Sequence, residues 1–146
     1  MAVLNGRIER PPDVVWALLE DGHSYADWVV GTRQVHEVDD TWPAVGSRLR
    51  FTAGFGPFTV EDITTVRRIE PKRSLELEAH AGWLGSARIC FDVRSWGEHT
   101  LVIIDEHPLS GLGARWHNAV LEVLFRFRNR RMLENLDHAV KNRSQR

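Results

Sequence analysis

Residues 114–142, ARWHNAVLEVLFRFRNRRMLENLDHAVKN, contain neither proline nor glycine. A stretch of that length predicts one helix, which would be about 40 Å long at ~1.5 Å per residue. Apolar residues recur along it at helical spacing, so we expect its apolar side to lie against the rest of the protein. The upstream elements must therefore provide a surface long enough to cover one side of this helix.

The region upstream of this helix alternates apolar and polar residues with a period of two, which is typical of β-strands. Turn signals such as Asp39-Asp40, Glu70-Pro71 and Gly97 separate the alternating runs. Connections this short favour an antiparallel meander. The expected strands are Thr32–Val38, Ser47–Ala53, Thr59–Ile69, Ser74–His80, Gly85–Ser95 and Thr100–His107.

The N-terminal region predicts one more strand and two short helices. Val3–Arg10 alternates like a strand and stops at Pro11-Pro12-Asp13, where proline suits the first helical turn because its missing N–H has no partner there. A short helix is expected over Val14–Leu19, and Ser24 is expected to cap a second short turn that includes Trp28. The pattern predicts an α+β protein in which a curved antiparallel sheet of about seven strands wraps around the long C-terminal helix.

The composition is that of one globular domain over residues 1–146, with 42% hydrophobic and 27% charged residues. No run approaches the ~20 apolar residues of a membrane helix, and the N-terminus lacks the features of a secretion signal, so no integral membrane association is expected. Cys90 is the single cysteine and cannot form an internal disulfide. That favours a reducing, cytoplasmic location.

The net charge of -1 is unevenly distributed along the chain. Residues 115–146 carry 8 basic and 3 acidic side chains, whereas residues 1–114 carry 11 basic and 17 acidic ones. A basic segment can bind nucleic acid or an acidic membrane surface. Because the domain as a whole is not basic, a solvated helix face is the favoured interpretation, and nucleic acid is not an expected partner. The basic residues of that face are Arg126, Arg128, Arg130 and Arg131.

Six short motifs, in order along the chain, resemble those of the START-like helix-grip superfamily (SRPBCC), and within it the polyketide cyclase/dehydrase and lipid-transport family. Together they span nearly the whole chain. The motifs are Pro11–Leu19, Tyr25-x-x-Trp28-Val29-Val30-Gly31, Trp42–Leu49, Glu70-Pro71-x-Arg73-x-Leu75-x-Leu77, Glu106-His107-Pro108-x-x-Gly111 and Arg128-Asn129-x-x-x-Leu133-x-x-Leu136.

The resemblance implies a helix-grip fold, with two short helices after the first strand. It also implies a cavity between sheet and long helix that holds a hydrophobic molecule such as a polyketide, a sterol or another lipid. The superfamily shares no single catalytic motif, so the resemblance assigns no catalytic residue.

Strand alternation and helical spacing predict which side chains face the space between sheet and helix. Each of them could simply be core, since most apolar stripes are packing, but the resemblance favours a ligand cavity for the set. The expected lining residues are Trp28, Leu49, Phe51, Thr64, Leu77, Trp83, Ala87, Ile89, Phe91, Val102, Ile104, Trp116, Val120, Val123, Leu124 and Phe127.

Two carboxylates fall in the inward phase of the strands. Glu106 ends the strand that begins at Thr100, and Asp62 lies in the middle of the strand Thr59–Ile69. A carboxylate facing an apolar cavity could act as an acid, a base or a ligand anchor. The structural alternative is that it pairs with an arginine such as Arg88. His107 and His117 are separated by Pro108 and a glycine-containing turn, so they could approach one another at the opening of the cavity.

Other chemistry is not expected. The spacing of His107, His117 and Glu106 matches no metal-binding signature, so no metal is expected. The glycine pairs at 54–56 and 111–113 lack the continuation of a nucleotide-binding loop, so no cofactor is expected. Cys90 falls out of the inward phase and has no evident base, which argues against a nucleophilic role.

Two hypotheses of different classes follow. The first is a non-catalytic protein that binds a small hydrophobic ligand of lipid, polyketide or aromatic type. The second is an enzyme, a polyketide aromatase/cyclase or dehydratase in which Glu106, Asp62 or His117 would move protons. A homodimer through a free sheet edge is compatible with either.

Overall fold

The structure is a computed structural model that describes residues 2–30, 32–55, 57–80, 86–110 and 119–144. Within these residues, helices and strands follow one another in the predicted order, and most strand ends agree with the predicted ends within two residues. In chain order they are β1 (Ala2–Ile8), α1 (Pro12–Leu19), η1 (Gly22–Ser24), α2 (Tyr25–Trp28), β2 (Thr32–Val38), β3 (Arg48–Phe55), β4 (Phe58–Glu70), β5 (Ser74–His80), β6 (Ser86–Trp96), β7 (His99–Ser110) and α4 (Ala119–Ser144).

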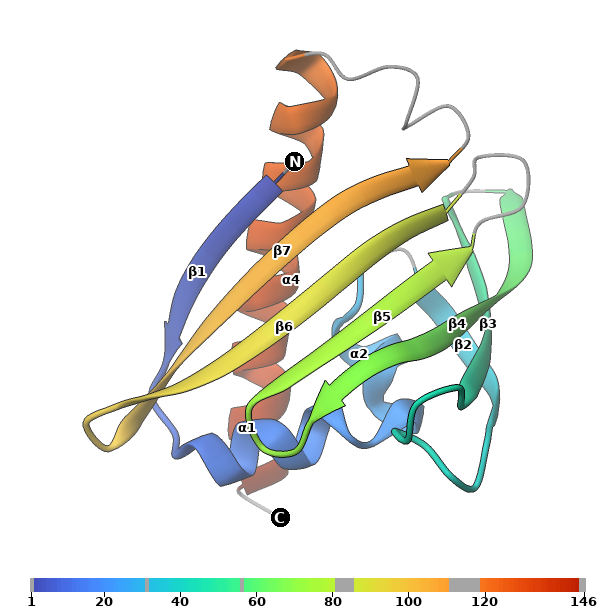
Figure 1. Cartoon of the computed structure of the whole chain (residues 1–146). Helices are drawn as coiled ribbons and strands as arrows, with labels where there is room; N and C mark the ends of the chain where they lie inside the picture. Colours follow the sequence, from blue (N-terminus) through green and yellow to red (C-terminus); the bar gives the residue numbers. More distant parts are fainter. Residues whose placement is uncertain (1, 31, 56, 81–85, 111–118, 145–146) are drawn as a thin grey trace.

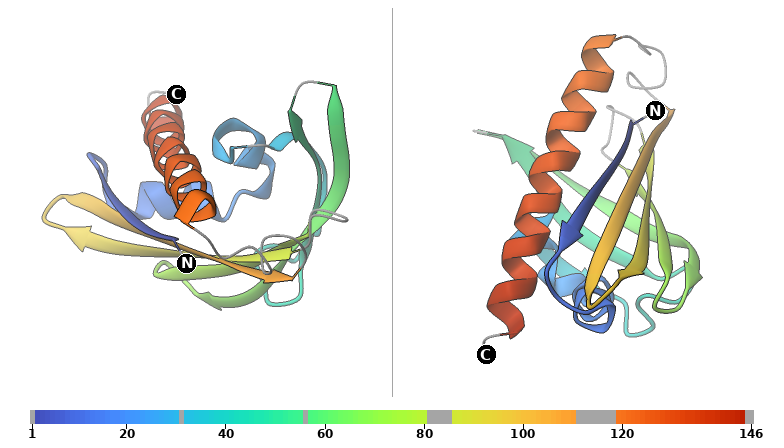
Figure 2. Two further views of the ribbon diagram at one scale, coloured as in Figure 1. Left: turned by 90° about the horizontal axis from the view of Figure 1, so that it is seen from above. Right: turned by 90° about the vertical axis from the view of Figure 1, so that its left-hand side faces the viewer.

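The strands form one antiparallel sheet in the order β1-β7-β6-β5-β4-β3-β2. From β2 to β7 every strand pairs with the next one along the chain, and β1 pairs with β7. Figure 1 shows α4 running along one face of this sheet, and Figure 2 shows the sheet curving around that helix. This arrangement confirms the α+β, helix-grip architecture, including the two short helices after the first strand.

The inner face of the sheet, which faces α4, is largely apolar. The register places Ile104 beside Phe91 and Phe91 beside Leu75, and all three are buried. Successive side chains of a strand point to opposite faces, so residues two apart continue the same surface. The buried apolar residues of the strands are Ile8, Leu49, Phe51, Val66, Leu75, Leu77, Ile89, Phe91, Val93, Val102 and Ile104.

Helix α4 contacts β1, β7, α1 and α2. Its described buried residues recur at spacings of one and two helical turns, which gives one continuous inner stripe. Gly6 of β1 permits a close approach, since a Cβ built there would lie 3.2 Å from Cδ1 of Leu133. The buried residues of the stripe are Asn129, Met132, Leu133, Leu136 and Val140.

The two short helices cover the C-terminal half of α4. Trp28 of α2 is buried and packs edge-on against Phe91, with ring centroids 5.4 Å apart. The side-chain amide of Asn135 donates a hydrogen bond to the Trp28 carbonyl at 3.5 Å. Arg143 reaches Asp21 at 2.9 Å. These contacts place an aromatic side chain between the helix and the inner face of the sheet.

The predicted cap on α2 was wrong. The Ser24 hydroxyl makes no cap bond but lies 2.9 Å from the carbonyl oxygen of Leu18 and accepts from the Trp28 indole N–H at 3.2 Å. A serine hydroxyl carries one donor and two acceptor positions, so it can join these two segments instead of closing a helix end. Ser24 therefore helps to hold Trp28 in the core.

The end of β7 also differs from the prediction. β7 continues past Pro108 to Ser110, and Pro108 remains paired with Ala87 of β6. The pairing of β1 with β7 ends opposite Glu106. Beyond that residue no described strand takes a hydrogen bond from that edge of β7, so Pro108, which has no N–H, is tolerated there. The predicted start of the long helix at Ala114 lies outside the described residues.

The variant Gly6→Val should lower the free energy of unfolding by about 1–3 kcal/mol, because the added methyl groups overpack the contact with Leu133. Urea denaturation measures the change. Asn5→Val, on the exposed side of the same strand, is the control and should change stability by less than about 0.5 kcal/mol. Equal losses in the two variants would contradict the close approach of α4 to β1.

Candidate functional site

Glu106 interrupts the apolar inner face of the sheet. It lies on β7 opposite Ile89, which is itself opposite Leu77 of β5. Its exposed fraction is 1%, in agreement with the inward phase that the alternation predicts. A buried carboxylate needs hydrogen bonds or a counter-charge to offset the loss of water.

Arg128 of α4 supplies that counter-charge. Its Nη1 atom donates to Oε2 of Glu106 at 2.7 Å, and the Arg128 side chain is 29% exposed. The expectation that an arginine pairs with Glu106 is correct, but Arg88 is the wrong partner. Arg88 points to the outer face of the sheet, where its Nε lies 2.9 Å from Oε1 of Glu76. Arg128 was also wrongly expected on the solvated face of the helix.

The next residue of α4, Asn129, is fully buried, and neither its Nδ2 nor its Oδ1 has a hydrogen-bond partner among the residues that the structure describes. Oε1 of Glu106 is also buried and has no hydrogen-bond partner in the described part of the chain. A buried polar group left without a hydrogen bond costs about 1–3 kcal/mol. Glu106, Arg128 and Asn129 are here called the Glu106 centre.

Asn129 was not among the predicted site residues, although the sequence contains a pattern that distinguishes it. Asn129 precedes Met132, Leu133 and Leu136 at helical spacing, so a polar amide occupies a position of the apolar stripe. Polar residues at such positions are buried only with a partner or at a cost in stability. Asn129 is the buried polar exception among the described residues of this stripe.

The predicted lining residues on the described strands and on α2 lie in the core. As contacts to a ligand they remain predictions. Ala87 is half-buried, Trp83 and Trp116 lie outside the described residues, and the side chains of residues 119–126, with Val120, Val123 and Leu124, lie outside the described part as well. The buried members are Trp28, Leu49, Phe51, Thr64, Leu77, Ile89, Phe91, Val102 and Ile104.

Phe127 requires a correction, because its side chain is 74% exposed and does not face the interior. Residues two apart on a helix lie on nearly opposite sides, and Asn129 occupies the inner stripe. Apolar residues occur on every side of the segment 119–127, so its composition does not define which side is inward. The arginine-rich residues that follow interrupt the apolar pattern, so the pattern did not identify the side of the helix that faces inward.

The other predicted proton-moving residues do not join the Glu106 centre. Asp62 lies on β4, three strand spacings from Glu106 on β7, which is roughly 14 Å along the sheet. One of its carboxylate oxygens accepts from the Ile63 backbone N–H at 2.8 Å. His117 lies outside the described residues. Among the described residues, Glu106 and Asp62 therefore lie on different parts of the sheet.

No group of three or more His, Cys, Asp or Glu side chains in the described part of the chain has the arrangement of a metal site. His107 lies 3.1 Å from Asp105 on the outer face of the sheet, and the two are adjacent to a half-buried thiol. Among the described helices, none is long and apolar enough to cross a membrane.

A depression of about 350 Å³ on the outer face surrounds Cys90. Burial raises the pKa of the Cys90 thiol, and the carboxylates of Glu76, Asp92 and Asp105 raise it further, against a smaller opposite effect of Arg68. A thiol with a raised pKa is a poor nucleophile because the thiolate is the reactive form. This agrees with the expectation that Cys90 has no nucleophilic role.

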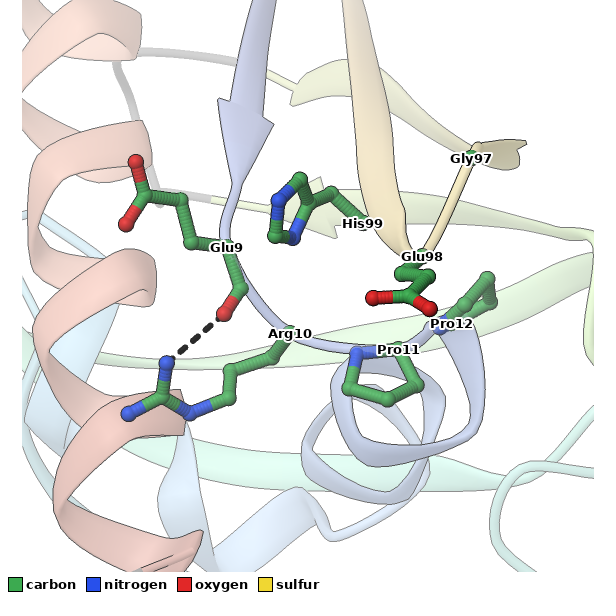
Figure 3. Close-up of a pocket in the computed structure, with 7 residues that line it drawn as sticks. All are labelled: Glu9, Arg10, Pro11, Pro12, Gly97, Glu98 and His99. Atoms are coloured by element: carbon green, nitrogen blue, oxygen red, sulfur yellow. Dashed lines mark hydrogen bonds between the residues drawn. The ribbon is translucent and has the colours of Figure 1, made fainter.

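A second depression, of about 490 Å³, lies at the other end of β7 (Figure 3). It is formed by the β1–α1 connection and the β6–β7 turn. In its wall, the guanidinium of Arg10 donates a hydrogen bond to the backbone carbonyl of Glu9 at 2.7 Å. His99 is seven residues from Glu106 along β7, which is roughly 24 Å, so this depression is separate from the Glu106 centre. Its lining residues are Glu9, Arg10, Pro11, Pro12, Gly97, Glu98 and His99.

No sequence-family profile matches the chain, and no curated protein sequence matches it either. Solved structures do match. NE0264 from Nitrosomonas europaea is 12% identical with a TM-score of 0.75, over 99% of this chain and 96% of that one. Ara h 8.0201 is 10% identical with a TM-score of 0.74, over 96% of each chain.

DynU16, a protein in the dynemicin biosynthetic locus, is 15% identical with a TM-score of 0.72 over 96% of this chain. The present chain spans 46% of the length of DynU16. Identities this low show a shared fold and do not extend to chemistry. These matches confirm the helix-grip fold that the resemblance implies.

Cys90 should react with iodoacetamide more slowly than free cysteine at neutral pH, since its raised pKa keeps the thiol protonated. The rate should increase as the pH rises above the ordinary thiol range. Asp105→Asn removes one of the carboxylates that raise the pKa and should speed the reaction at a given pH. A rate at neutral pH equal to that of free cysteine would contradict this environment.

Arg128→Met should lower the free energy of unfolding by about 2–3 kcal/mol, since it leaves Glu106 buried without its counter-charge. The partial exposure of Arg128 places the effect at the lower end of the range for buried pairs. Adding Glu106→Leu to this variant should restore part of the loss. Chemical denaturation measures all three proteins.

The matched control is Arg131→Met on the same helix. Arg131 lies 3.7 Å from Glu134, and both side chains are more than half exposed. Removing this pair should change stability by less than about 0.5 kcal/mol. If Arg131→Met cost as much as Arg128→Met, burial would not distinguish the two pairs.

Proposed function

We propose that this protein binds a small, largely apolar molecule between the inner face of the sheet and α4, and that the Glu106 centre holds a polar group of that molecule. The observation that carries the proposal is that Glu106 and Asn129 lie in a largely apolar interior and keep polar atoms that have no hydrogen-bond partner among the described residues. A bound polar group would supply the missing hydrogen bonds. Ligand sites of this kind combine apolar walls with a few polar groups that fix orientation.

The apolar part of the ligand would contact the inner face of the sheet. Burial of apolar surface contributes about 25 cal/mol per Å², so most of the affinity would come from this contact. The proposed contacts include Trp28 and Phe91, two buried aromatic residues whose rings pack edge to face at 79°. A lipid, a polyketide or an aromatic compound fits this description.

Two further expectations belong to the same proposal. A reducing, cytoplasmic location is supported by the single cysteine of the sequence. A non-catalytic role is supported by the distance between Asp62 and Glu106, because proton transfer at two positions of a substrate needs two groups in reach of it. A homodimer remains a prediction from the sequence.

The second candidate function is a polyketide aromatase/cyclase or dehydratase. It is favoured by one observation, the unpartnered Oε1 of Glu106, which could accept a proton from a bound substrate. Incubation with a polyketide-type substrate separates the candidates. The enzyme would convert it to a product of different chromatographic behaviour, whereas the binding protein would release it unchanged.

Native and denaturing mass spectrometry of the purified protein should reveal a stoichiometric apolar adduct that is lost on unfolding. In ligand-free protein, Asn129→Leu should raise the melting temperature, because it removes two unpartnered buried atoms and keeps a similar volume. The same change should weaken binding of the adduct, as measured by tryptophan fluorescence. Met132→Leu, on the same stripe, is the control and should leave both quantities nearly unchanged.

The opposite result would be equally informative. If Asn129→Leu lowered the melting temperature and left binding intact, Asn129 would be a structural residue. No adduct, together with no fluorescence response to a panel of lipids and aromatic compounds, would remove the binding proposal.

A further inference from the structure

We infer that the exposed side of α4 around Phe127 binds the surface of a membrane that contains anionic lipids. The inference goes beyond the proposed function, because it concerns the outer side of the helix and needs no ligand in the interior. It follows from two neighbouring residues of α4 that lie on the opposite faces from those expected.

Phe127 was expected to face the interior and Arg128 to face solvent, and the structure has the reverse arrangement. The side chain of Phe127 is largely exposed, while Arg128 turns toward Glu106. Single apolar side chains are common on protein surfaces. The meaning of an exposed phenylalanine therefore depends on the residues that surround it.

The neighbours of Phe127 on the helix surface are arginines. Residues three and four apart lie side by side on a helix, which places Arg130 and Arg131 next to Phe127, and all three are exposed. The segment between Glu122 and Glu134 holds four arginines and no acidic residue. Arg131 lies 3.7 Å from Glu134, but both side chains are more than half exposed, so water screens this pair strongly. Phe127, Arg130 and Arg131 are here called the Phe127 face.

No described element covers the Phe127 face. Helix α4 contacts β1, β7, α1 and α2, and Figure 2 shows its other side turned away from the sheet and from the two short helices. A single helix presents a convex strip to its surroundings. Such a strip lies readily along a flat surface, whereas it offers no groove to a peptide.

A membrane with anionic lipids complements both kinds of side chain on this face. When an amphipathic helix lies on a membrane, its aromatic residues enter the boundary between headgroups and acyl chains, and its basic residues stay beside the phosphates. The long side chain of arginine permits this, because its methylene groups can accompany Phe127 while the guanidinium remains in the polar layer. Duplex DNA offers phosphates to the arginines but no apolar layer to Phe127. The lipid surface is therefore the partner that engages all three residues.

The test is sedimentation of the purified protein with lipid vesicles. Vesicles of phosphatidylcholine with about 30% phosphatidylglycerol should bind the protein, because their negative surface potential attracts arginine. Vesicles of phosphatidylcholine alone should bind it at least about tenfold more weakly. Added salt should weaken binding to the charged vesicles, since it screens the attraction.

Variants of the Phe127 face separate its apolar and charged parts. Phe127→Ala should weaken binding to the charged vesicles by about fivefold or more, whereas Phe127→Trp should bind at least as tightly as the unchanged protein, because tryptophan favours the membrane interface. Arg130→Gln combined with Arg131→Gln should weaken binding by about tenfold or more. Because the substituted side chains are exposed, the melting temperature of each variant should stay nearly unchanged.

Two exposed residues elsewhere provide matched controls. Trp96 is an exposed aromatic residue at the end of β6, and Arg94 is an exposed arginine of the same strand, 2.9 Å from Asp92. Trp96→Ala and Arg94→Gln remove the same kinds of side chain as the test variants, at a distance from the Phe127 face. Both should leave vesicle binding unchanged.

The outcomes are distinct from those that test ligand binding. Absence of binding to the charged vesicles would overturn this inference and leave the proposed function in place. Equal losses in Trp96→Ala and Phe127→Ala, or no loss in any variant of the Phe127 face, would overturn the assignment to that face. Binding to duplex DNA as tight as to the charged vesicles, or a dimer that Phe127→Ala dissociates, would give the face a different partner and overturn the inference as well.

Discussion

The packing of α4 against β1 and β7 is the contact on which the rest of the interior depends. The inner stripe of the helix lies so close to β1 that a Cβ built at Gly6 would lie 3.2 Å from Cδ1 of Leu133, so an added side chain requires Leu133 to shift. This contact fixes the rotation of the helix about its own axis. With that rotation fixed, Asn129 must face inward, and Arg128 at the border of the stripe reaches Glu106 on the neighbouring strand.

The interior combines favourable apolar packing with a local arrangement that reduces stability. The apolar rows of the sheet and the cluster around Trp28 supply the favourable burial. The Glu106 centre places a charge pair and an amide in the same interior, and its unpartnered atoms cost free energy in the absence of a ligand. Binding sites commonly show this trade-off, since groups prepared for a ligand are poorly satisfied without one.

Much of the fold could be predicted from the sequence because its strands have one buried and one solvated face. Alternation with a period of two identifies such strands and also indicates their inward residues, which is why Leu77, Phe91 and Glu106 were placed correctly. The helix was harder. Apolar residues occur on every side of its segment 119–127, so neither the rotation that exposes Phe127 nor the inward position of Asn129 could be selected by periodicity alone. Partners across the interior, such as Arg128 for Glu106, depend on that rotation and could not be identified before it was known.

The pairing of β1 with β7 joins the beginning of the described chain to its last strand. Ile8 pairs with Thr100 and Ala2 with Glu106, so the sheet has a high contact order at this edge. During synthesis, β1 leaves the ribosome long before its partner exists, and the meander from β2 to β7 can form without it. The surface that receives α4 is therefore completed only after β7 has been synthesised. Until then β1 lacks its partner strand, and an unpaired strand is a segment prone to aggregation.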